Sequence, residues 1–209
     1  MDKIDLIEKI KETKSTPIAQ KIKERTNAFD NLNQQSNDKW FSELCFCILT
    51  ANFNAKGAIK IQENLFFNFA VLPQNELEKQ LRQFGHRFPN KRAEFIFEAQ
   101  KYSHNIKTII TFLNEQDART WLVKNIKGIG MKEASHFLRN VGYCNSAIID
   151  FHIIDILIKH NIIQRPKTLN QKTYEKIEEE LRKIASECDL NLSQLDLYLW
   201  YLETETVLK

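Results

Sequence analysis

The stretch Leu122–Asp150, LVKNIKGIGMKEASHFLRNVGYCNSAIID, decides the fold, because it places a short glycine hairpin between two helical patterns. Gly128 and Gly130 permit backbone conformations that a β-carbon would penalise. The helix that follows them is expected to begin with bare N–H groups, and its positive dipole end suits a phosphate. The sequence therefore predicts two helices joined by a hairpin that can hold an anion.

Lys132 falls in the first turn of the helix after the hairpin. The positive end of a helix dipole favours the neutral amine over the ammonium. A neutral lysine is a nucleophile that forms a Schiff base with a sugar or carbonyl carbon. Most lysines beside a glycine turn are solvated surface groups, so the hairpin and the lysine alone leave both interpretations open.

Asp150 follows downstream between two apolar runs, Ala147–Ile149 and Phe151–Ile154. Burying a carboxylate costs free energy unless the group is paired or used, which favours a functional role. An aspartate directly before Phe151 also fits the N-cap of a helix. The two roles are compatible, because an N-cap side chain is held rigidly.

Helical periodicity runs through the rest of the chain, and no alternating strand pattern stands beside it. The predicted helices cover residues 16–32, 36–49, 54–69, 73–84, 91–104, 106–113, 117–125, 131–141, 151–160, 171–188 and 192–203. The strongly apolar segment 36–49 is expected to be the central buried helix. The predicted fold class is all-α.

Composition limits the class of protein. The 209 residues carry a formal net charge of +3, which permits nucleic-acid binding through a local patch without requiring it. No apolar run approaches the length of a membrane span, and the N-terminus MDKIDLIEKIKE is too charged for a signal peptide. We therefore expect an intracellular, cytoplasmic protein with no membrane partner.

The cysteines and histidines give no sign of a metal site. Cys45, Cys47, Cys144 and Cys188 are scattered, and an intracellular compartment keeps such thiols reduced. The histidines show no metal-ligand spacing with them. We expect neither a disulfide nor a bound metal.

Further segments join the hairpin in a resemblance to a known family. They are Glu43–Asn52 (ELCFCILTAN), Gly85–Ala93 (GHRFPNKRA) and the terminal Lys209. With the hairpin and its aspartate, they resemble the type-2 8-oxoguanine DNA glycosylase/AP lyases, in the helix-hairpin-helix Gly/Pro/Asp superfamily of base-excision repair glycosylases. The resemblance extends over nearly the whole chain.

The resemblance implies a single glycosylase domain over residues 1–209, built as two helical lobes with a DNA-binding cleft. The approximate lobes are 36–115 and 116–190, joined by the terminal helices. Some superfamily members hold an iron–sulfur cluster on C-terminal cysteines, and this chain has no such cysteine cluster. No cofactor is expected beyond a monovalent cation at the hairpin.

The resemblance also implies roles for the residues around the hairpin. Lys132 would attack C1′ of the deoxyribose, and Asp150 would stabilise the positive charge that grows on the sugar. The backbone amides of Gly128 and Gly130 would hold a DNA phosphate. Arg87 and Lys91 would meet neighbouring phosphates, although surface cations of this kind are usually only solvated.

Four residues are candidates for the base pocket. Phe88 and Trp200 suit stacking on a flipped base, and the alternative for Trp200 is a place in the core. Asn52 would donate to the base edge, or it would merely end its helix. The resemblance assigns Lys209 to the discrimination of 8-oxoguanine from guanine, and the alternative is a frayed terminus.

The predicted function is excision of 8-oxoguanine from double-stranded DNA, followed by strand cleavage, by a monomeric, nucleoid-associated enzyme. One alternative is a glycosylase/lyase of the same superfamily that removes another oxidised base. The other is a non-catalytic helix-hairpin-helix DNA-binding module, which would not need Lys132 and Asp150.

Overall fold

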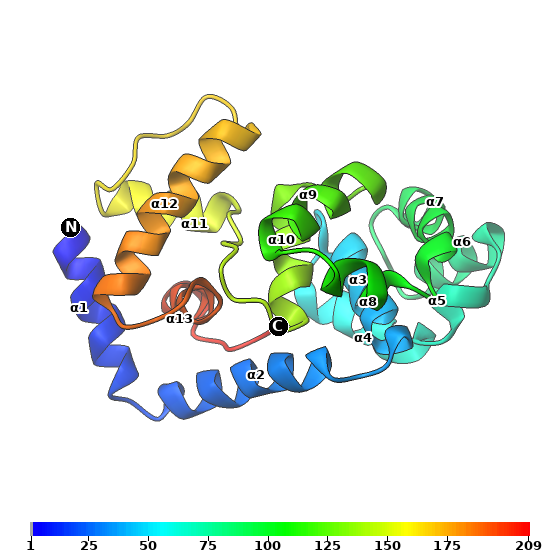
Figure 1. Cartoon of the computed structure of the whole chain (residues 1–209), viewed down its shortest axis with the longest axis horizontal. Helices are drawn as coiled ribbons and strands as arrows, with labels where there is room; N and C mark the ends of the chain where they lie inside the picture. The colour runs from blue at the N-terminus through cyan, green and yellow to red at the C-terminus, as the bar shows by residue number, and fades with distance from the viewer. Residues whose placement is uncertain (1) are drawn as a thin grey trace. The chain divides into compact units, whose positions relative to one another are not determined.

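The computed structural model describes residues 2–209, which form helices and no strand (Figure 1). The predicted all-α fold class is confirmed. The helices are α1 (Lys3–Lys14), α2 (Ile18–Asn33), α3 (Asn37–Thr50), α4 (Ala55–Leu65), α5 (Asn68–Val71), α6 (Gln74–Gln83), α7 (Pro89–Ala99), the 3₁₀ turn η1 (Gln100–Tyr102), α8 (Ile106–Thr111), α9 (Glu115–Asn125), α10 (Met131–Asn140), α11 (Phe151–Lys159), α12 (Gln171–Glu187) and α13 (Leu192–Thr204).

The chain divides into two compact units. Unit 1 contains Met1–Asp30 and Gly142–Lys209, and unit 2 contains Asn31–Val141. This division differs from the lobes expected at 36–115 and 116–190, because residues 116–141 belong to unit 2. Within that unit α10 contacts both α9 and α3.

Unit 2 is built around α3, whose residues from Trp40 to Thr50 are all buried. This helix contacts α4, α5, α7, α8 and α10, which lie around it in Figure 1. The prediction that this segment forms a central buried helix is confirmed. Burial of a whole helix surface requires apolar residues on every side, which explains the continuous run from Leu44 to Leu49.

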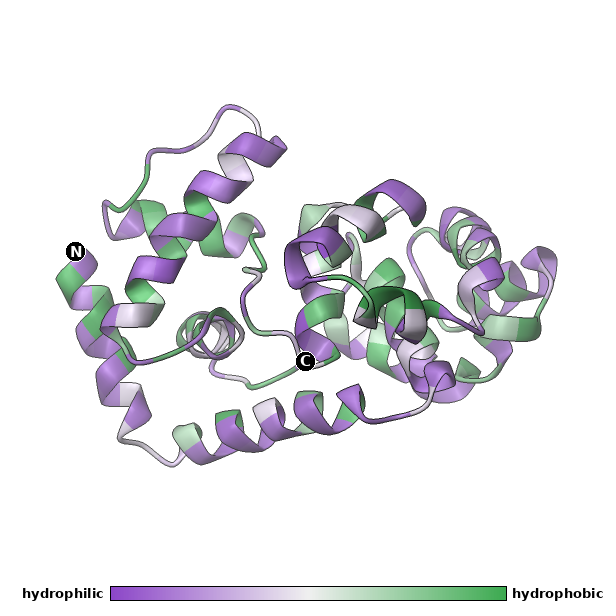
Figure 2. Cartoon of the chain, in the orientation of Figure 1, coloured by the Kyte–Doolittle hydropathy of each residue, from purple (hydrophilic) through white to green (hydrophobic). Residues whose placement is uncertain are grey.

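Unit 1 is organised around α13, which contacts α1, α11 and α12. Leu195, Leu197 and Leu199 of α13 are buried. Figure 2 shows polar and apolar residues alternating along α12, as expected for a helix with one face on a core. Its buried residues include Tyr174, Ile177, Leu181 and Ile184.

Two predicted helices end differently in the structure. The segment 54–69 is divided into α4 and α5. The segment 91–104 begins earlier, with Pro89 in the first turn of α7, and its C-terminal part is the 3₁₀ turn η1. Proline is favoured at the first helical position because its fixed φ suits a helix and its missing N–H is not needed there.

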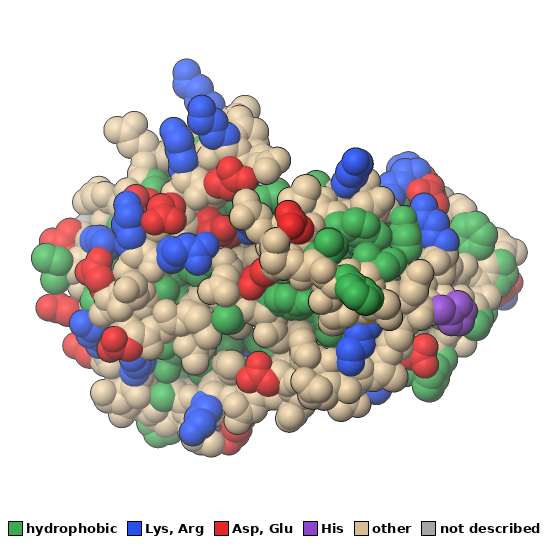
Figure 3. All heavy atoms as spheres, viewed as in Figure 1, with side chains coloured by type: hydrophobic (Ala, Val, Ile, Leu, Met, Phe, Trp, Pro, Cys, Tyr) green, Lys and Arg blue, Asp and Glu red, His purple; other side chains and the backbone are tan. Residues whose placement is uncertain are grey.

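The molecular surface carries charges of both signs. On the face shown in Figure 3, lysine and arginine side chains lie among aspartate and glutamate side chains. No helix among residues 2–209 is long and apolar enough to cross a membrane.

Candidate active site

The hairpin Ile126–Gly130 connects α9 to α10, as the sequence predicts. Gly128 has a φ of +82°, in the left-handed region that favours glycine. Ile129 N donates to Ile126 O over 3.2 Å, which closes the turn, and Gly130 occupies the N-cap position of α10. Gly128 therefore allows the turn, and α10 begins directly after Gly130.

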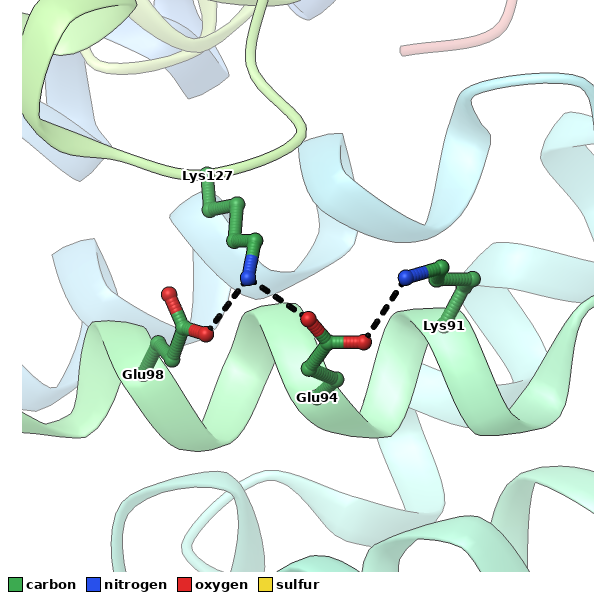
Figure 4. Close-up of polar contacts among 4 residues, drawn as sticks. All are labelled: Lys91, Glu94, Glu98 and Lys127. Atoms are coloured by element: carbon green, nitrogen blue, oxygen red, sulfur yellow. Dashed lines mark hydrogen bonds and ion pairs between the residues drawn. The ribbon is translucent and has the colours of Figure 1, made fainter.

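An ion-pair cluster ties the hairpin to α7 (Figure 4). Lys127 Nζ lies 2.6 Å from Glu94 Oε1 and 2.7 Å from Glu98 Oε1. Lys91 Nζ lies 3.0 Å from Glu94 Oε2. The hydrogen bonds that Lys127 donates to Glu94 and Glu98 raise the pKa of Lys127 to about 12, and those that Lys127 and Lys91 donate to Glu94 lower the pKa of Glu94.

Lys132, the candidate nucleophile, is the second residue of α10, and its side chain is 24% exposed. Its Nζ lies 4.0 Å from Glu133 Oε1. Glu133 Oε2 accepts from Gly130 N over 3.3 Å. The helix N-terminus is therefore not bare at this amide, which differs from the sequence-based expectation. A glutamate three residues after an N-cap is half of a capping box, and that signal identifies Glu133.

A buried polar network fixes the other end of α10 to α3 and α4. Asn140 Nδ2 donates to Glu43 Oε1 over 2.6 Å, and Gln62 Nε2 donates to Glu43 Oε2 over 3.0 Å. Arg139 donates to Asn140 Oδ1 through Nε and Nη2, over 3.0 and 2.8 Å. These bonds compensate the cost of burying Glu43 and hold the helix that carries Lys132.

Asp150 is the N-cap of α11, since its Oδ1 accepts from Ile153 N over 3.0 Å. The predicted cap is confirmed. The segment before it is fixed to α12, where Ala147 N donates to Glu178 and Ile149 N donates to the Tyr174 hydroxyl. Asp150 is thus held rigidly within unit 1, whereas Lys132 belongs to unit 2.

Unit 1 also carries two candidates for the base pocket. Trp200 is partly exposed on α13, and its ring meets the His152 ring edge to face at 5.8 Å between centroids. Its Nε1 is buried without a hydrogen-bond partner among the described residues. Lys209 is partly buried beyond Glu205, a left-handed residue that ends α13.

The remaining candidates lie in unit 2. Phe88 precedes α7 and is 39% exposed. The guanidinium of Arg87 lies 5.1 Å from the centroid of its ring. Asn52 follows α3 with a φ of 58°, a conformation that asparagine tolerates better than most residues, so it does end its helix. Lys91, expected to contact DNA, is engaged with Glu94.

Among residues 2–209, no group of three or more histidine, cysteine, aspartate or glutamate side chains is arranged to hold a metal ion. The four cysteines are all free thiols.

Comparisons with known proteins agree with the resemblance. The profile of the 8-oxoguanine DNA glycosylase family matches residues 22–190. An 8-oxoguanine DNA glycosylase/AP lyase of Methanocaldococcus jannaschii is 53% identical over 206 residues, which cover 98% of this chain and 99% of that protein. A protein of the same name from Korarchaeum cryptofilum is 45% identical over 207 residues, 98% of each chain.

The structure is also similar to a crystal structure of the Methanocaldococcus jannaschii glycosylase/lyase in complex with a 15mer DNA containing 8-oxoguanine. The TM-score is 0.95 at 52% identity, and the match covers 98% of this chain and 99% of that one. The family profile ends at residue 190, but these full-length matches extend over α13.

Proposed function

Because this chain belongs to the 8-oxoguanine DNA glycosylase family, we propose that it excises 8-oxoguanine from double-stranded DNA and then cleaves the strand at the abasic site. The observation that carries the proposal is Lys132, an amine in the first turn of a helix that follows a glycine hairpin. The enzyme would act as a monomer inside the cell, where its DNA substrate lies.

Base excision begins with flipping, because a base stacked in a duplex cannot be reached. Unstacking costs a few kcal/mol, least for a damaged or mismatched base. Lys132 Nζ then forms a bond to C1′ of the deoxyribose while the glycosidic bond breaks and its electron pair leaves with the base. Loss of the amine proton and opening of the sugar ring give a Schiff base between Lys132 and C1′.

Strand cleavage follows from the electron-withdrawing imine, which acidifies the proton on C2′. A base removes that proton, a double bond forms between C2′ and C3′, and the bond from C3′ to the phosphate oxygen breaks. This β-elimination cuts the strand 3′ to the abasic site. Hydrolysis of the imine releases Lys132.

Asp150 supplies negative charge where the sugar becomes positive. Its N-cap bond to Ile153 N fixes the orientation of the carboxylate. A fixed charge needs no reorganisation as the oxocarbenium-like charge develops, which is the main source of electrostatic catalysis. Asp150 would also help to accept the proton that Lys132 releases.

The hairpin would position the strand by holding a phosphate with the amides around Gly128 and Gly130, and Gly130 N would exchange its bond to Glu133 Oε2 for one to the phosphate. This contact is independent of sequence. We also propose that a monovalent cation binds the loop Ile126–Gly130, since backbone carbonyl oxygens are neutral ligands that such ions take in proteins. When bound, the ion would add positive charge beside the phosphate. Arg87 and Lys91 would add further phosphate contacts.

The base would be recognised by residues that have room to contact it. Phe88 presents an exposed ring, and Trp200 is partly exposed, so that both rings could stack on the flipped base. Asn52 is exposed and offers an amide donor. 8-Oxoguanine differs from guanine by an oxygen at C8 and a proton on N7, and we propose that Lys209 senses this difference with its ammonium or its α-carboxylate.

The test is borohydride trapping on a duplex with one 8-oxoguanine opposite cytosine. Wild type and Lys124→Gln, which changes an exposed lysine on α9, should form a covalent complex, and Lys132→Gln should not. Trapping at a preformed abasic site but not at 8-oxoguanine would indicate another damaged base as the substrate. No complex on either duplex would favour a non-catalytic DNA-binding module.

A further inference from the structure

His86 lies buried between the end of α3 and the loop that carries Phe88, with 4% of its surface exposed. Its Nδ1 accepts from Phe88 N over 3.0 Å, and its Nε2 donates to Leu49 O over 3.0 Å. The Phe53 ring lies over it, at 4.2 Å between centroids and 35° between planes. One side chain thus joins two segments that are far apart in sequence.

The two contacts require one protonation state. Nδ1 must be unprotonated to accept from the Phe88 amide, and Nε2 must carry the proton to donate to a carbonyl. Burial lowers the pKa of His86, and the positive charge of Arg92 lowers it further, against the opposing effect of the Leu49 carbonyl. The neutral ring is therefore favoured near neutral pH.

A hydrogen bond from Arg92 also connects α7 to the end of α3. Arg92, on α7, donates from Nη2 to Ala51 O over 2.5 Å. His86 and Arg92 therefore hold carbonyls on both sides of Thr50, directly before the left-handed residue Asn52. The turn that carries Asn52 and the loop that carries Phe88 are fixed against each other by this pair.

We propose that His86 is a positioning residue for base excision, which sets the backbone of Phe88 against the Asn52 turn while the Phe88 ring stays exposed. The inference rests on the proposed function, in which both residues meet the flipped base. Contacts that prearrange such groups lower the barrier, because a displacement of about 1 Å in a positioning group can cost about 100-fold in rate. His86 acts through Phe88 and does not itself touch the base.

The two hydrogen bonds can be removed one at a time. In His86→Asn, the amide oxygen lies near the position of Nδ1 and keeps the acceptor for Phe88 N. In His86→Gln, the amide nitrogen lies near the position of Nε2 and keeps the donor to Leu49 O. We expect His86→Gln to slow excision of 8-oxoguanine about 10-fold or more, and His86→Asn to slow it less. Cleavage at a preformed abasic site, which needs no base stacking, should change little in either variant.

A double-mutant cycle tests whether His86 acts through Phe88. In a Phe88→Ala background, His86→Gln should cause no further loss of excision, because the ring that it positions is gone. Additive losses would overturn the inference, as would equal losses of excision and abasic-site cleavage. Thermal unfolding of each variant shows whether a loss of activity reflects a loss of the fold.

A measurement on the unchanged protein is independent of the variants. ¹⁵N NMR of the histidines should show His86 in its neutral form with the proton on Nε2, and the Phe88 amide should exchange slowly with solvent. A proton on Nδ1, or a rapidly exchanging Phe88 amide, would overturn the inference. A wild-type protein that does not excise 8-oxoguanine would instead defeat the proposed function.

Discussion

The ring of Phe95 lies against Gly128 so closely that a β-carbon on residue 128 would come within 2.2 Å of Phe95 Cδ2. Phe95 follows Glu94 on α7, so an apolar contact and the ion pairs of Lys127 hold the hairpin at the same place. Gly128 is required both by its φ of +82° and by the absence of space.

Gly128→Ala should destabilise the protein more than Gly85→Ala. Gly85 also has a positive φ, of +73°, but a β-carbon there would meet nothing within 4 Å. Both variants carry the backbone cost of about 1–2 kcal/mol for a left-handed residue. Gly128→Ala also forces Phe95 to move, which typically costs a further 1–3 kcal/mol or so. Urea unfolding measures the difference.

The same pair of variants reports on DNA binding. Displacement of Phe95 would move the hairpin, so Gly128→Ala should also weaken binding to an undamaged duplex. Equal free energies of unfolding for the two variants would show that Phe95 moves aside without cost.

Replacing Lys127 with methionine should raise the pKa of Glu94 toward its ordinary value. Lys127 is the largest cause of the lowered pKa, and Lys91 is the second, so Lys91→Met should raise it less. NMR of the Glu94 carboxyl carbon through an acid titration measures both. A larger change in Lys91→Met would contradict the arrangement in Figure 4.

The ion pairs of Lys127 with Glu94 and Glu98 also predict how the attachment of the hairpin to α7 depends on pH. The pKa of Glu94 is lower in the folded protein, so its contribution to stability is present above its ordinary pKa of 4.5 and is lost as the pH falls through the lowered value. The pKa of Lys127 is raised to about 12, so its contribution is present below 10.5 and is lost as the pH rises toward 12. The hairpin amides should be more protected from hydrogen exchange, relative to unfolded amides at the same pH, between these limits than outside them. This difference should be absent in Lys127→Met.

The local features of the fold were predictable from the sequence. Helical periodicity located α3, and the spacing of Gly128 and Gly130 located the hairpin. Asp150 was predicted as an N-cap because an aspartate before an apolar helical run has a strong preference for that position. Each of these signals depends on residues that are close in sequence.

Apart from Glu133, which caps Gly130 N three residues away, the residues that sequence analysis missed act over long sequence separations. Phe95 contacts Gly128, Glu94 and Glu98 pair with Lys127, and His86 bonds to Leu49 O. No periodic pattern indicates that α7 lies against the hairpin. The division of the chain at residue 142 was missed for the same reason, because it depends on which helices pack together.

Asp150→Asn should keep the N-cap hydrogen bond of α11 and remove the negative charge of the carboxylate. Asparagine caps helices about as well as aspartate, so the free energy of unfolding should change by less than about 0.5 kcal/mol. The carboxylate charge is lost, and excision should fall by about 100-fold or more if that charge stabilises the transition state. Single-turnover excision and urea unfolding measure the two effects.

Asp150→Ala is the matched control, since it removes both features and should also cost about 1 kcal/mol of stability. Near-normal excision by Asp150→Asn would reduce this residue to its structural role as a cap.

Deleting Lys209 should narrow the preference for 8-oxoguanine over guanine. A pocket that pairs with a group of one base rejects the base that lacks it, so we expect the ratio of excision rates to fall about 10-fold or more. Lys209→Met removes the ammonium and keeps the terminal carboxylate in place, so the ratio in this variant shows which group is used. Cleavage at a preformed abasic site is the control for both variants. An unchanged ratio in the deletion would remove Lys209 from the pocket and leave the discrimination to other residues.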